Sequence, residues 1–342
     1  MSDSALEAIR ATVQRDLGGR GLDPDLFAVC AGDFAEACRS LAQPSAELAV
    51  VTGFWIATAG RFETDGPPGA LFLARVLREL GIRVRIYTDA AAVGILRDGC
   101  AEATIEEIPA ALPVSVTHLL ALERVGPGHT LETLHDSAEK ELFAAEIPEG
   151  ERGRCRSMRG IDITEYTTPS EHLFLAPGVL LPSPPVLRGR GVGGERVGSG
   201  TEDPLTPNPS PPSTGARGTG SYTTIGIGDG GNEIGMGKEP WSTIRRAIPR
   251  GGSIACRVPA DHLLVAGVSN WGAYALAAGV AVLRGQRLGK LFDPIREELT
   301  VRRMVEAGLI DGVSGVRTAT VDGLPVAVHA EVLTRLGQIV GG

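Results

Sequence analysis

Short runs of aliphatic residues alternate with helix-like segments along this chain. The run Glu47–Thr52 (ELAVVT) has the unbroken apolar pattern of a strand that is buried on both faces. A helix-like segment at 70–80 follows it, with prolines before it and Gly81 after it, and a second strand-like run lies at 83–88. Strand, helix and strand in this order form a right-handed βαβ unit with parallel strands. The pattern predicts an α/β fold, a Rossmann-like three-layer sandwich with a mostly parallel sheet.

Further strand-like runs extend the pattern through the chain. They lie at 103–108, 116–121, 223–227, 261–267 and 316–325, with helix-like segments between most of them and a last helix-rich region after 273. The segment 178–220 differs, because it is rich in Pro, Gly, Ser and Thr and cannot bury enough apolar surface to offset its ordering entropy. Its PxxP spacing also allows a partner-binding interpretation. We predict a single domain over 1–342, interrupted by a disordered insertion at 178–220.

The composition excludes several classes of protein. The formal net charge is −8 and the arginines are scattered, so no concentrated basic face for nucleic acid is expected. No apolar run approaches the roughly 18 residues that span a bilayer, so no membrane association is expected. The five cysteines form no CxxC pair, and the start of the chain resembles neither a secretory signal nor a transit peptide. These features predict a cytoplasmic protein and leave its oligomeric state open.

The densest group of polar residues lies in the glycine-rich stretch 221–238 (SYTTIGIGDGGNEIGMGK). Its polar side chains are those of Asp229, Asn232, Glu233 and Lys238. Glycine lets a backbone adopt positive φ or approach a ligand closely, so Gly230 and Gly231 predict a loop whose amides line a pocket. A tight turn with solvated charges is the alternative, but so many functional groups within ten residues make it the weaker one. This stretch is therefore the first candidate for an active site.

Polar loops that contain glycine follow five of the predicted strands. In an open parallel sheet, ligands bind beyond the carboxyl ends of the strands, where such loops converge. The sequence therefore predicts one shared pocket. Candidates outside the glycine-rich stretch are Glu63, Asp65, Asp89, Glu123, Arg124, Ser269, Asn270 and Trp271. Structural alternatives stay open, because Asp65 suits a turn, Asp89 suits a helix cap and Trp271 suits a packed core.

A GxGxxG string at 226–231 is typical of dinucleotide binding. No acid that would bind a ribose follows it at the expected distance, and the lysine–serine pair of a Walker A motif is absent. No nucleotide cofactor is therefore expected.

The motif GIGDGGNEIGMGK at 226–238 resembles the D-glutamate cyclase family, and so do other stretches of the chain. These are VTGFWI (51–56), ETDGPPGA (63–70), ALERVGPG (121–128), SMRGIDI (157–163), VAGVSNWGAY (265–274), DGV (311–313) and TVDGL (320–324). The resemblance covers most of the chain, but not 178–220. It implies a carbon–oxygen lyase that converts D-glutamate, or a similar acidic amino acid, into 5-oxo-D-proline with loss of water.

The resemblance also implies parts for this lactam closure. Asp229 or Glu233 would take a proton from the substrate amine before it attacks the γ-carboxyl carbon. Asp65 or Glu123, held neutral, would protonate the departing oxygen. Donors to the tetrahedral oxyanion would come from the amides of Gly230 and Gly231 and the side chains of Asn232 and Lys238.

Substrate-binding and metal sites follow from the same resemblance. The α-carboxylate would lie on Arg124 or at the helix start formed by Ser269 and Asn270, beside Trp271. A divalent metal, Mg²⁺ or Mn²⁺, would instead polarise the carboxyl group. Its possible ligands are Asp65, Asp89 and Asp229. No metal requirement follows from the sequence alone.

Two other functions stay open. The resemblance is to the C-terminal domain of two-part family members, which carry a further N-terminal domain. If that domain performs the cyclisation, this chain would be a non-catalytic amino-acid-binding or regulatory module. GDGGNE is also similar to the late GDGxND motif of haloacid-dehalogenase-type phosphatases, which hold Mg²⁺. Those enzymes need an earlier DxD after a strand, whereas the DxD at 23–25 follows GGRGL, so this alternative is weaker.

Overall fold

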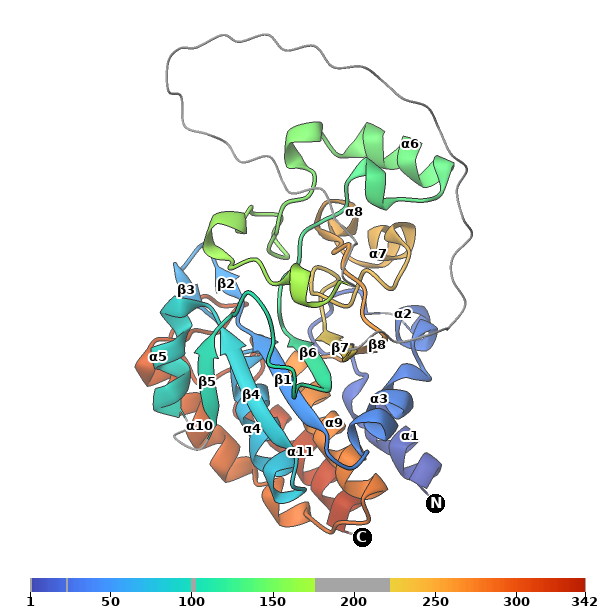
Figure 1. Ribbon diagram of the computed structural model, residues 1–342. Coiled ribbons are helices and arrows are strands. Elements are labelled where there is room, and N and C mark those ends of the chain that lie inside the picture. The colour runs from blue at the N-terminus through green and yellow to red at the C-terminus, as the bar shows by residue number, and fades with distance from the viewer. Residues whose placement is uncertain (1, 23, 100–102, 176–221, 342) are drawn as a thin grey trace.

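The centre of the computed structural model is a six-stranded parallel sheet with the order β5-β4-β1-β6-β7-β8 (Figure 1). The structure describes residues 2–22, 24–99, 103–175 and 222–341. The strands are β1 (Glu47–Thr52), β4 (Arg83–Thr88), β5 (Thr104–Glu107), β6 (His118–Leu122), β7 (Thr223–Gly228) and β8 (His262–Val265). The predicted α/β fold with a parallel sheet is confirmed. The predicted insertion at 178–220 falls outside the described residues, so the prediction of disorder stays a prediction.

The strand order creates a crevice beside β1. The chain adds β4 and β5 on one side of β1 and then crosses back to place β6, β7 and β8 on the other side. The loops that leave β1 and β6 therefore run in opposite directions. In doubly wound sheets, such a reversal of strand order leaves room for a ligand at the carboxyl ends of the strands.

Side chains of the sheet alternate between two hydrophobic layers. Leu48 and Val50 of β1 belong to one core cluster, whereas Ala49 and Val51 belong to the other, as the two-residue period of a strand requires. The first layer holds α1 (Ser2–Val13), α3 (Asp33–Leu41), α4 (Pro67–Glu79), α5 (Ala90–Gly99), α9 (Ser269–Leu283), α10 (Pro294–Ala307) and α11 (Val326–Gly341). The second layer holds α2 (Pro24–Val29), α6 (Ser137–Glu146), α7 (Trp241–Ala247) and α8 (Gly251–Ile254). The predicted three-layer sandwich is thus confirmed (Figure 1).

Helix α9 is buried along most of its length, because α1, α3, α4 and α11 all pack on it. It begins at Ser269, four residues before the predicted start at 273. The prediction was wrong because the free amides of its first turn are capped by Asp65, a residue about two hundred positions earlier in the chain. Ser269 and Asn270 therefore lie inside the helix rather than in a loop before it.

The strand-like run at 316–325 forms turns instead of a strand. The carboxylate of Asp311 organises them by accepting hydrogen bonds from the amides of Ser314 (2.7 Å) and Gly323 (2.7 Å). A small antiparallel pair, β2 (Trp55–Ile56) and β3 (Arg61–Phe62), lies in the loop after β1. Within the described ranges, no helix is both long and apolar enough to cross a bilayer.

Candidate active site

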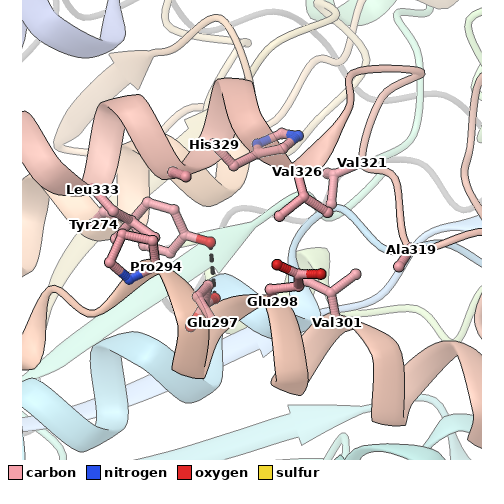
Figure 2. A pocket seen from close by; sticks show the side chains of 11 residues that line it. Tyr274, Pro294, Glu297, Glu298, Val301, Ala319, Val321, Val326, His329 and Leu333 are labelled. Carbon is pink, nitrogen blue, oxygen red and sulfur yellow. Dashed lines mark hydrogen bonds between the residues drawn. The ribbon is translucent and has the colours of Figure 1, made fainter.

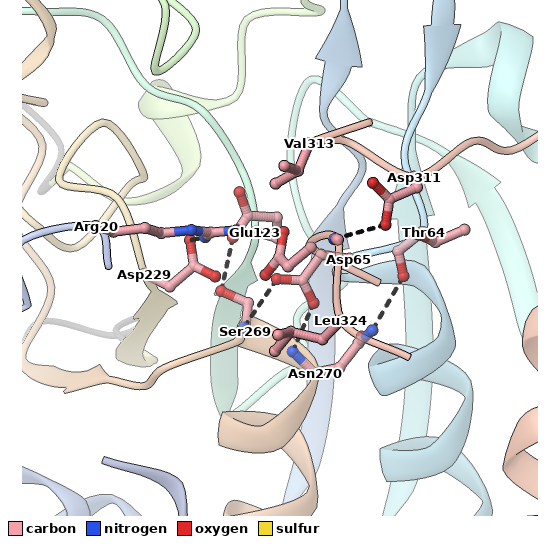
Figure 3. Close-up of polar contacts among 12 residues, drawn as sticks. Arg20, Thr64, Asp65, Glu123, Asp229, Ser269, Asn270, Asp311, Val313 and Leu324 are labelled. Atoms are coloured by element: carbon pink, nitrogen blue, oxygen red, sulfur yellow. Dashed lines mark hydrogen bonds and ion pairs between the residues drawn. The ribbon is translucent and has the colours of Figure 1, made fainter. Parts of the chain in front are cut away.

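Three acidic side chains from three separate loops meet at the start of α9. Asp65 lies between β3 and α4, Glu123 directly follows β6, and Asp229 directly follows β7. One carboxylate oxygen from each lies within 4.8 Å of the others. Figure 3 shows these side chains converging beside Ser269. The strand order thus brings together acids that the sequence predicted at the carboxyl ends of different strands.

Asp65 is held in place by the first turn of α9. Its carboxylate accepts hydrogen bonds from the amides of Ser269 (2.8 Å), Asn270 (2.8 Å) and Gly66 (3.0 Å). The side-chain oxygen of Asn270 accepts from the amides of Gly66 (3.0 Å) and Gly69 (2.7 Å). These bonds satisfy helix-end amides and fix the Asp65 carboxylate in one orientation. Asn270 thus ties the starts of α4 and α9 together.

Glu123 has a strained backbone and a fixed side chain. Its φ is +45°, a left-handed conformation that is uncommon for non-glycine residues. The hydroxyl of Ser269 donates to its Oε2 at 2.7 Å. The side chain is 5 % exposed, and it lines a pocket. Ser269 therefore orients an acid, a role that the sequence did not indicate.

Sequence patterns assigned no role to Arg20 or Asp322, but the structure places both in this cluster. The guanidinium of Arg20 pairs with Asp229 and with Asp322 (2.5 Å to Oδ1). Arg20 reaches the cluster because the carboxylate of Asp16 accepts the amides of Arg20, Gly21 and Leu22 and folds this segment into a tight turn. In the sequence, only the glycines that flank Arg20 in GGRGL could have indicated a special turn at this residue. Asp322 lies in TVDGL, a stretch that carried the family resemblance.

The acids of this cluster lie in a poorly solvated environment. Burial raises the pKa of Glu63, Asp65, Glu123 and Asp229 well above the usual carboxyl range, and each of these acids lies near others that reinforce the shift. The charge of Arg20 opposes the pKa increase of Asp229, whereas the main influences on the pKa of Glu123 all raise it. Two acids on one pocket wall therefore differ in the charges that act on them.

A pocket of about 280 Å³ opens onto this cluster. Its polar wall includes Arg20, Glu63, Glu123, Asp229 and Asp322. Its apolar wall includes Phe54, Ile56, Met158, Ile161 and Val313. Among the described residues, Oδ2 of Asp229 and Oδ2 of Asp322 are buried and have no hydrogen-bond partner. Buried polar atoms are almost always paired, and these two oxygens belong to residues that line the pocket, so both are available to a ligand there.

Other residues of the glycine-rich stretch stabilise the loop after β7 by hydrogen bonds. The carboxylate of Glu233 accepts from the amides of Asp229 (3.2 Å) and Gly230, which oppose the burial that raises its pKa. The side-chain amide of Asn232 donates to the carbonyl of Arg156 at 2.7 Å. Gly231 has φ +89°, which favours glycine there. The amide of Gly230 is thus engaged by Glu233 rather than facing the pocket.

Four other predicted site residues form their contacts outside the acidic cluster. They are Asp89, Arg124, Lys238 and Trp271. Arg124 and Asp89 pair with each other, and Arg124 also donates to the carbonyls of Gly53 (3.0 Å) and Thr168 (2.5 Å). These contacts join four segments of the chain, and Asp89 is not among the three clustered acids. Because Arg124 is fully engaged by protein groups, it offers no evident site for a substrate carboxylate.

Lys238 and Trp271 also lie outside the pocket. Lys238 pairs with Asp33 of α3 and donates to the carbonyl of Asp261 (2.7 Å), and it lines a separate, wider groove. The indole of Trp271 is fully buried and donates to His329 at 2.8 Å. Neither residue touches the clustered acids. Of the DxD at 23–25, position 23 lies outside the described residues.

A second cavity between α9, α10 and α11 is shown in Figure 2. The hydroxyl of Tyr274 donates to Glu297 at 2.8 Å inside it. Its volume is about 20 Å³, which is room for about one water molecule. The acidic pocket is therefore the better candidate for binding an amino acid.

Comparison with known proteins agrees with the sequence motifs. The family model described as D-glutamate cyclase-like, C-terminal, matches residues 9–201 and 213–337. The mitochondrial D-glutamate cyclase of Homo sapiens is 29% identical over 375 aligned residues, which cover 99% of this chain and 53% of that protein. The chain thus spans about half the length of this relative. The family match runs through 178–201 and 213–220, so only 202–212 of the segment that we expected to lie outside the resemblance is unmatched.

Proposed function

The chain belongs to the family described as D-glutamate cyclase-like, C-terminal, and we propose that it converts D-glutamate into 5-oxo-D-proline with loss of water. The single observation that carries this proposal is the meeting of Asp65, Glu123 and Asp229 at a pocket of amino-acid size. Lactam closure needs a group that removes a proton and a group that supplies one. The pocket offers both. A cytoplasmic location and the lack of a nucleotide cofactor stay predictions.

Asp229 is the base in this proposal. Burial raises the pKa of Asp229 well above the usual carboxyl range, which makes it a stronger base when ionised, and the guanidinium of Arg20 opposes that rise. Its Oδ2 has no partner among the described residues. That oxygen would accept the proton of the substrate ammonium group. The neutral amine would then attack the γ-carboxyl carbon, forming the C–N bond of the ring. The attacking nitrogen would release its second proton to an oxygen of the tetrahedral intermediate, which turns that oxygen into the hydroxyl that departs.

Glu123 is the acid. Its pKa is raised by burial and then by the charges of neighbouring acids, which favours the protonated form. It would transfer its proton to the departing hydroxyl, so that water leaves as the γ-carbon–oxygen bond breaks. The hydroxyl of Ser269 holds this carboxyl at the pocket wall. Two acids with differing environments are a common arrangement for acid–base pairs.

The α-carboxylate of the substrate needs a cation that is not already neutralised. Arg159 lines the pocket and donates a hydrogen bond to the carbonyl of Val313 at 2.7 Å. We assign the α-carboxylate to Arg159 in place of Arg124. Guanidinium groups bind carboxylates with two parallel hydrogen bonds, which would orient the substrate.

The test is to incubate the purified chain with D-glutamate and with L-glutamate and to measure 5-oxoproline by chiral chromatography. Asp229→Asn and Glu123→Gln should each lower kcat at least about 100-fold, the usual range for loss of an acid or base. Glu239→Gln is the matched control, since Glu239 is a buried acid that accepts from Cys30 far from the pocket. It should retain wild-type turnover.

The proposal fails if the wild-type chain makes no 5-oxoproline, or if both variants keep wild-type kcat. Because the chain spans half of its relative, a binding or regulatory module is the second candidate. Binding of D-glutamate without turnover would support that candidate. A parallel screen for phosphate release tests the phosphatase alternative.

A further inference from the structure

We infer that Asp65, Glu123 and Asp229 together hold one hard divalent cation, Mg²⁺ or Mn²⁺. This set replaces the sequence-based combination of Asp65, Asp89 and Asp229, because Asp89 is engaged by Arg124. The catalytic role given to the cation below rests on the proposed function, whereas the binding site itself does not.

The geometry of the three carboxylates suits one shared ion. Their facing oxygens lie within 4.8 Å of one another, and the residues are 1 %, 5 % and 1 % exposed. Metal–oxygen distances of about 2.0 to 2.6 Å place ligand oxygens on opposite sides of an ion roughly 4 to 5 Å apart. An ion therefore fits between these loops with little movement. The group holds no histidine or cysteine, and oxygen-only ligands favour Mg²⁺, Mn²⁺ or Ca²⁺ over zinc.

An unpaired buried oxygen points into this cluster. Among the described residues, Oδ2 of Asp229 has no hydrogen-bond partner, although the residue is 1 % exposed. Figure 3 shows the Asp229 side chain directed toward Ser269 and Glu123. An unpaired carboxylate oxygen in a buried site is costly unless a ligand completes it.

The hydrogen bonds around the cluster are those expected of outer ligands to a metal site. The amides of Ser269 and Asn270 fix Asp65, and the hydroxyl of Ser269 fixes Glu123. Oδ2 of Asp65 and Oε2 of Glu123 each accept one of these bonds, which leaves a further lone pair on each oxygen for a cation. Such outer partners orient the carboxylates that bind the ion.

The charges in the pocket also favour a cation. The acids near the cluster are Glu63, Asp65, Glu123, Asp229 and Asp322. The guanidinium of Arg20 pairs with two of these acids, Asp229 and Asp322. The nearby Arg124 is neutralised by Asp89. A dication would offset the excess negative charge where it is greatest.

A cation at this position would polarise the γ-carboxyl group of D-glutamate. A carboxylate that binds a cation is ionised, so Glu123 would not act as the acid in the metal-bound chain. Asp229, whose oxygens each carry two lone pairs, would then accept the ammonium proton and return it to the departing oxygen beside the cation. The cation and Arg159 would then bind the two carboxylates of the substrate at opposite ends.

The test measures binding of Mn²⁺ to the full chain after EDTA treatment and buffer exchange, by calorimetry and by electron paramagnetic resonance, with Mg²⁺ as competitor. Wild type should bind one Mn²⁺ per chain. Asp229→Asn and Glu123→Gln should each weaken binding at least about ten-fold, because affinity follows the number of charged ligands. Glu239→Gln should bind as wild type does. Thermal unfolding of each variant without metal checks that it is folded.

The inference is overturned if wild type binds no stoichiometric Mn²⁺ or Mg²⁺ at millimolar concentrations, or if both cluster variants bind as wild type does. The cyclase assay separates this result from the proposed function. One bound Mn²⁺ without turnover would support the metal site and contradict the proposed reaction. Turnover in EDTA by a chain that binds no metal would keep the reaction and remove the site.

Discussion

Arg20 connects the two ends of the chain to the candidate active site. Its guanidinium bridges Asp229, which follows β7, and Asp322, which lies before α11. Both carboxylates are almost fully buried, and the Arg20 side chain is 14 % exposed. Loss of one partner of a buried ion pair leaves an uncompensated charge, so this single residue should contribute strongly to stability.

We expect Arg20→Met to lower the free energy of unfolding by about 3 to 5 kcal/mol, the usual cost of breaking a buried pair. The loss should be larger at pH 8 than at pH 5. Without Arg20, the pKa of Asp229 in the folded state rises further above its unfolded value, so the folded state binds protons more strongly and loses stability as the pH rises. Urea unfolding at both pH values measures this.

The control for this experiment is Arg39→Met. Arg39 pairs with Asp3 and Glu36 at the surface, where ion pairs contribute little. Its unfolding midpoint should stay near that of wild type. A wild-type midpoint for Arg20→Met at pH 8 would contradict the structural role given to Arg20.

At the level of elements, the loop before α4 and the loop after β6 touch at Gly66. This residue has φ +93°, and a Cβ there would lie 2.6 Å from Oγ1 of Thr52 and 2.8 Å from Cβ of Glu123. Those distances are too short for any side chain. The close approach brings Asp65 and Glu123 into one cluster.

Gly66→Ala should therefore cost about 3 kcal/mol or more, from backbone strain and from overpacking together. Gly81→Ala is the matched control, because Gly81 has φ +73° but no heavy atom lies within 4 Å of the position that a Cβ would take there. It should cost about 1 to 2 kcal/mol from strain alone. Chemical denaturation measures both. Equal costs would show that the two loops can separate without penalty.

At the level of the whole molecule, the segment 178–220 interrupts a continuous structure. The hydroxyl of Tyr222 donates to the carbonyl of Leu173, so the described parts on either side of the segment lie in contact. Both neighbouring regions contribute to the second hydrophobic layer. We propose that 1–342 form a single domain and that this segment is dispensable for it.

Replacing 178–220 with a short glycine–serine linker should leave the fold and the activity intact. Loop-closure entropy depends only weakly on length, so Tm should stay the same or rise by a few degrees. Circular dichroism, thermal unfolding and the 5-oxoproline assay compare the shortened and full-length chains. A shortened chain that is unfolded, or folded but inactive, would show that the segment contributes more than a connection.

Much of the fold could be predicted because its signals are local. The strands at 47–52 and 83–88 lie where their apolar runs predict them, since a fully buried strand needs an unbroken run of apolar residues. The parallel sheet followed from the alternation of strands and helices. Asp65, Glu123 and Asp229 were among the acids expected in a common pocket, because loops at the carboxyl ends of parallel strands share one edge of the sheet, but the sequence did not separate them from Asp89.

The sequence alone thus determined the α/β class and limited the candidate site to loops at one edge of the sheet. Only the tertiary structure decided which partner each charged side chain takes. In the folded chain, Arg124 pairs with Asp89, Lys238 pairs with Asp33 outside the pocket, and Arg20 pairs with Asp229. The physical reason is the sequence separation over which each effect acts. Apolar patterns and turn propensities depend on neighbouring residues, so they can be read from the sequence. These ion pairs join segments that are distant in the chain, and they leave no local pattern.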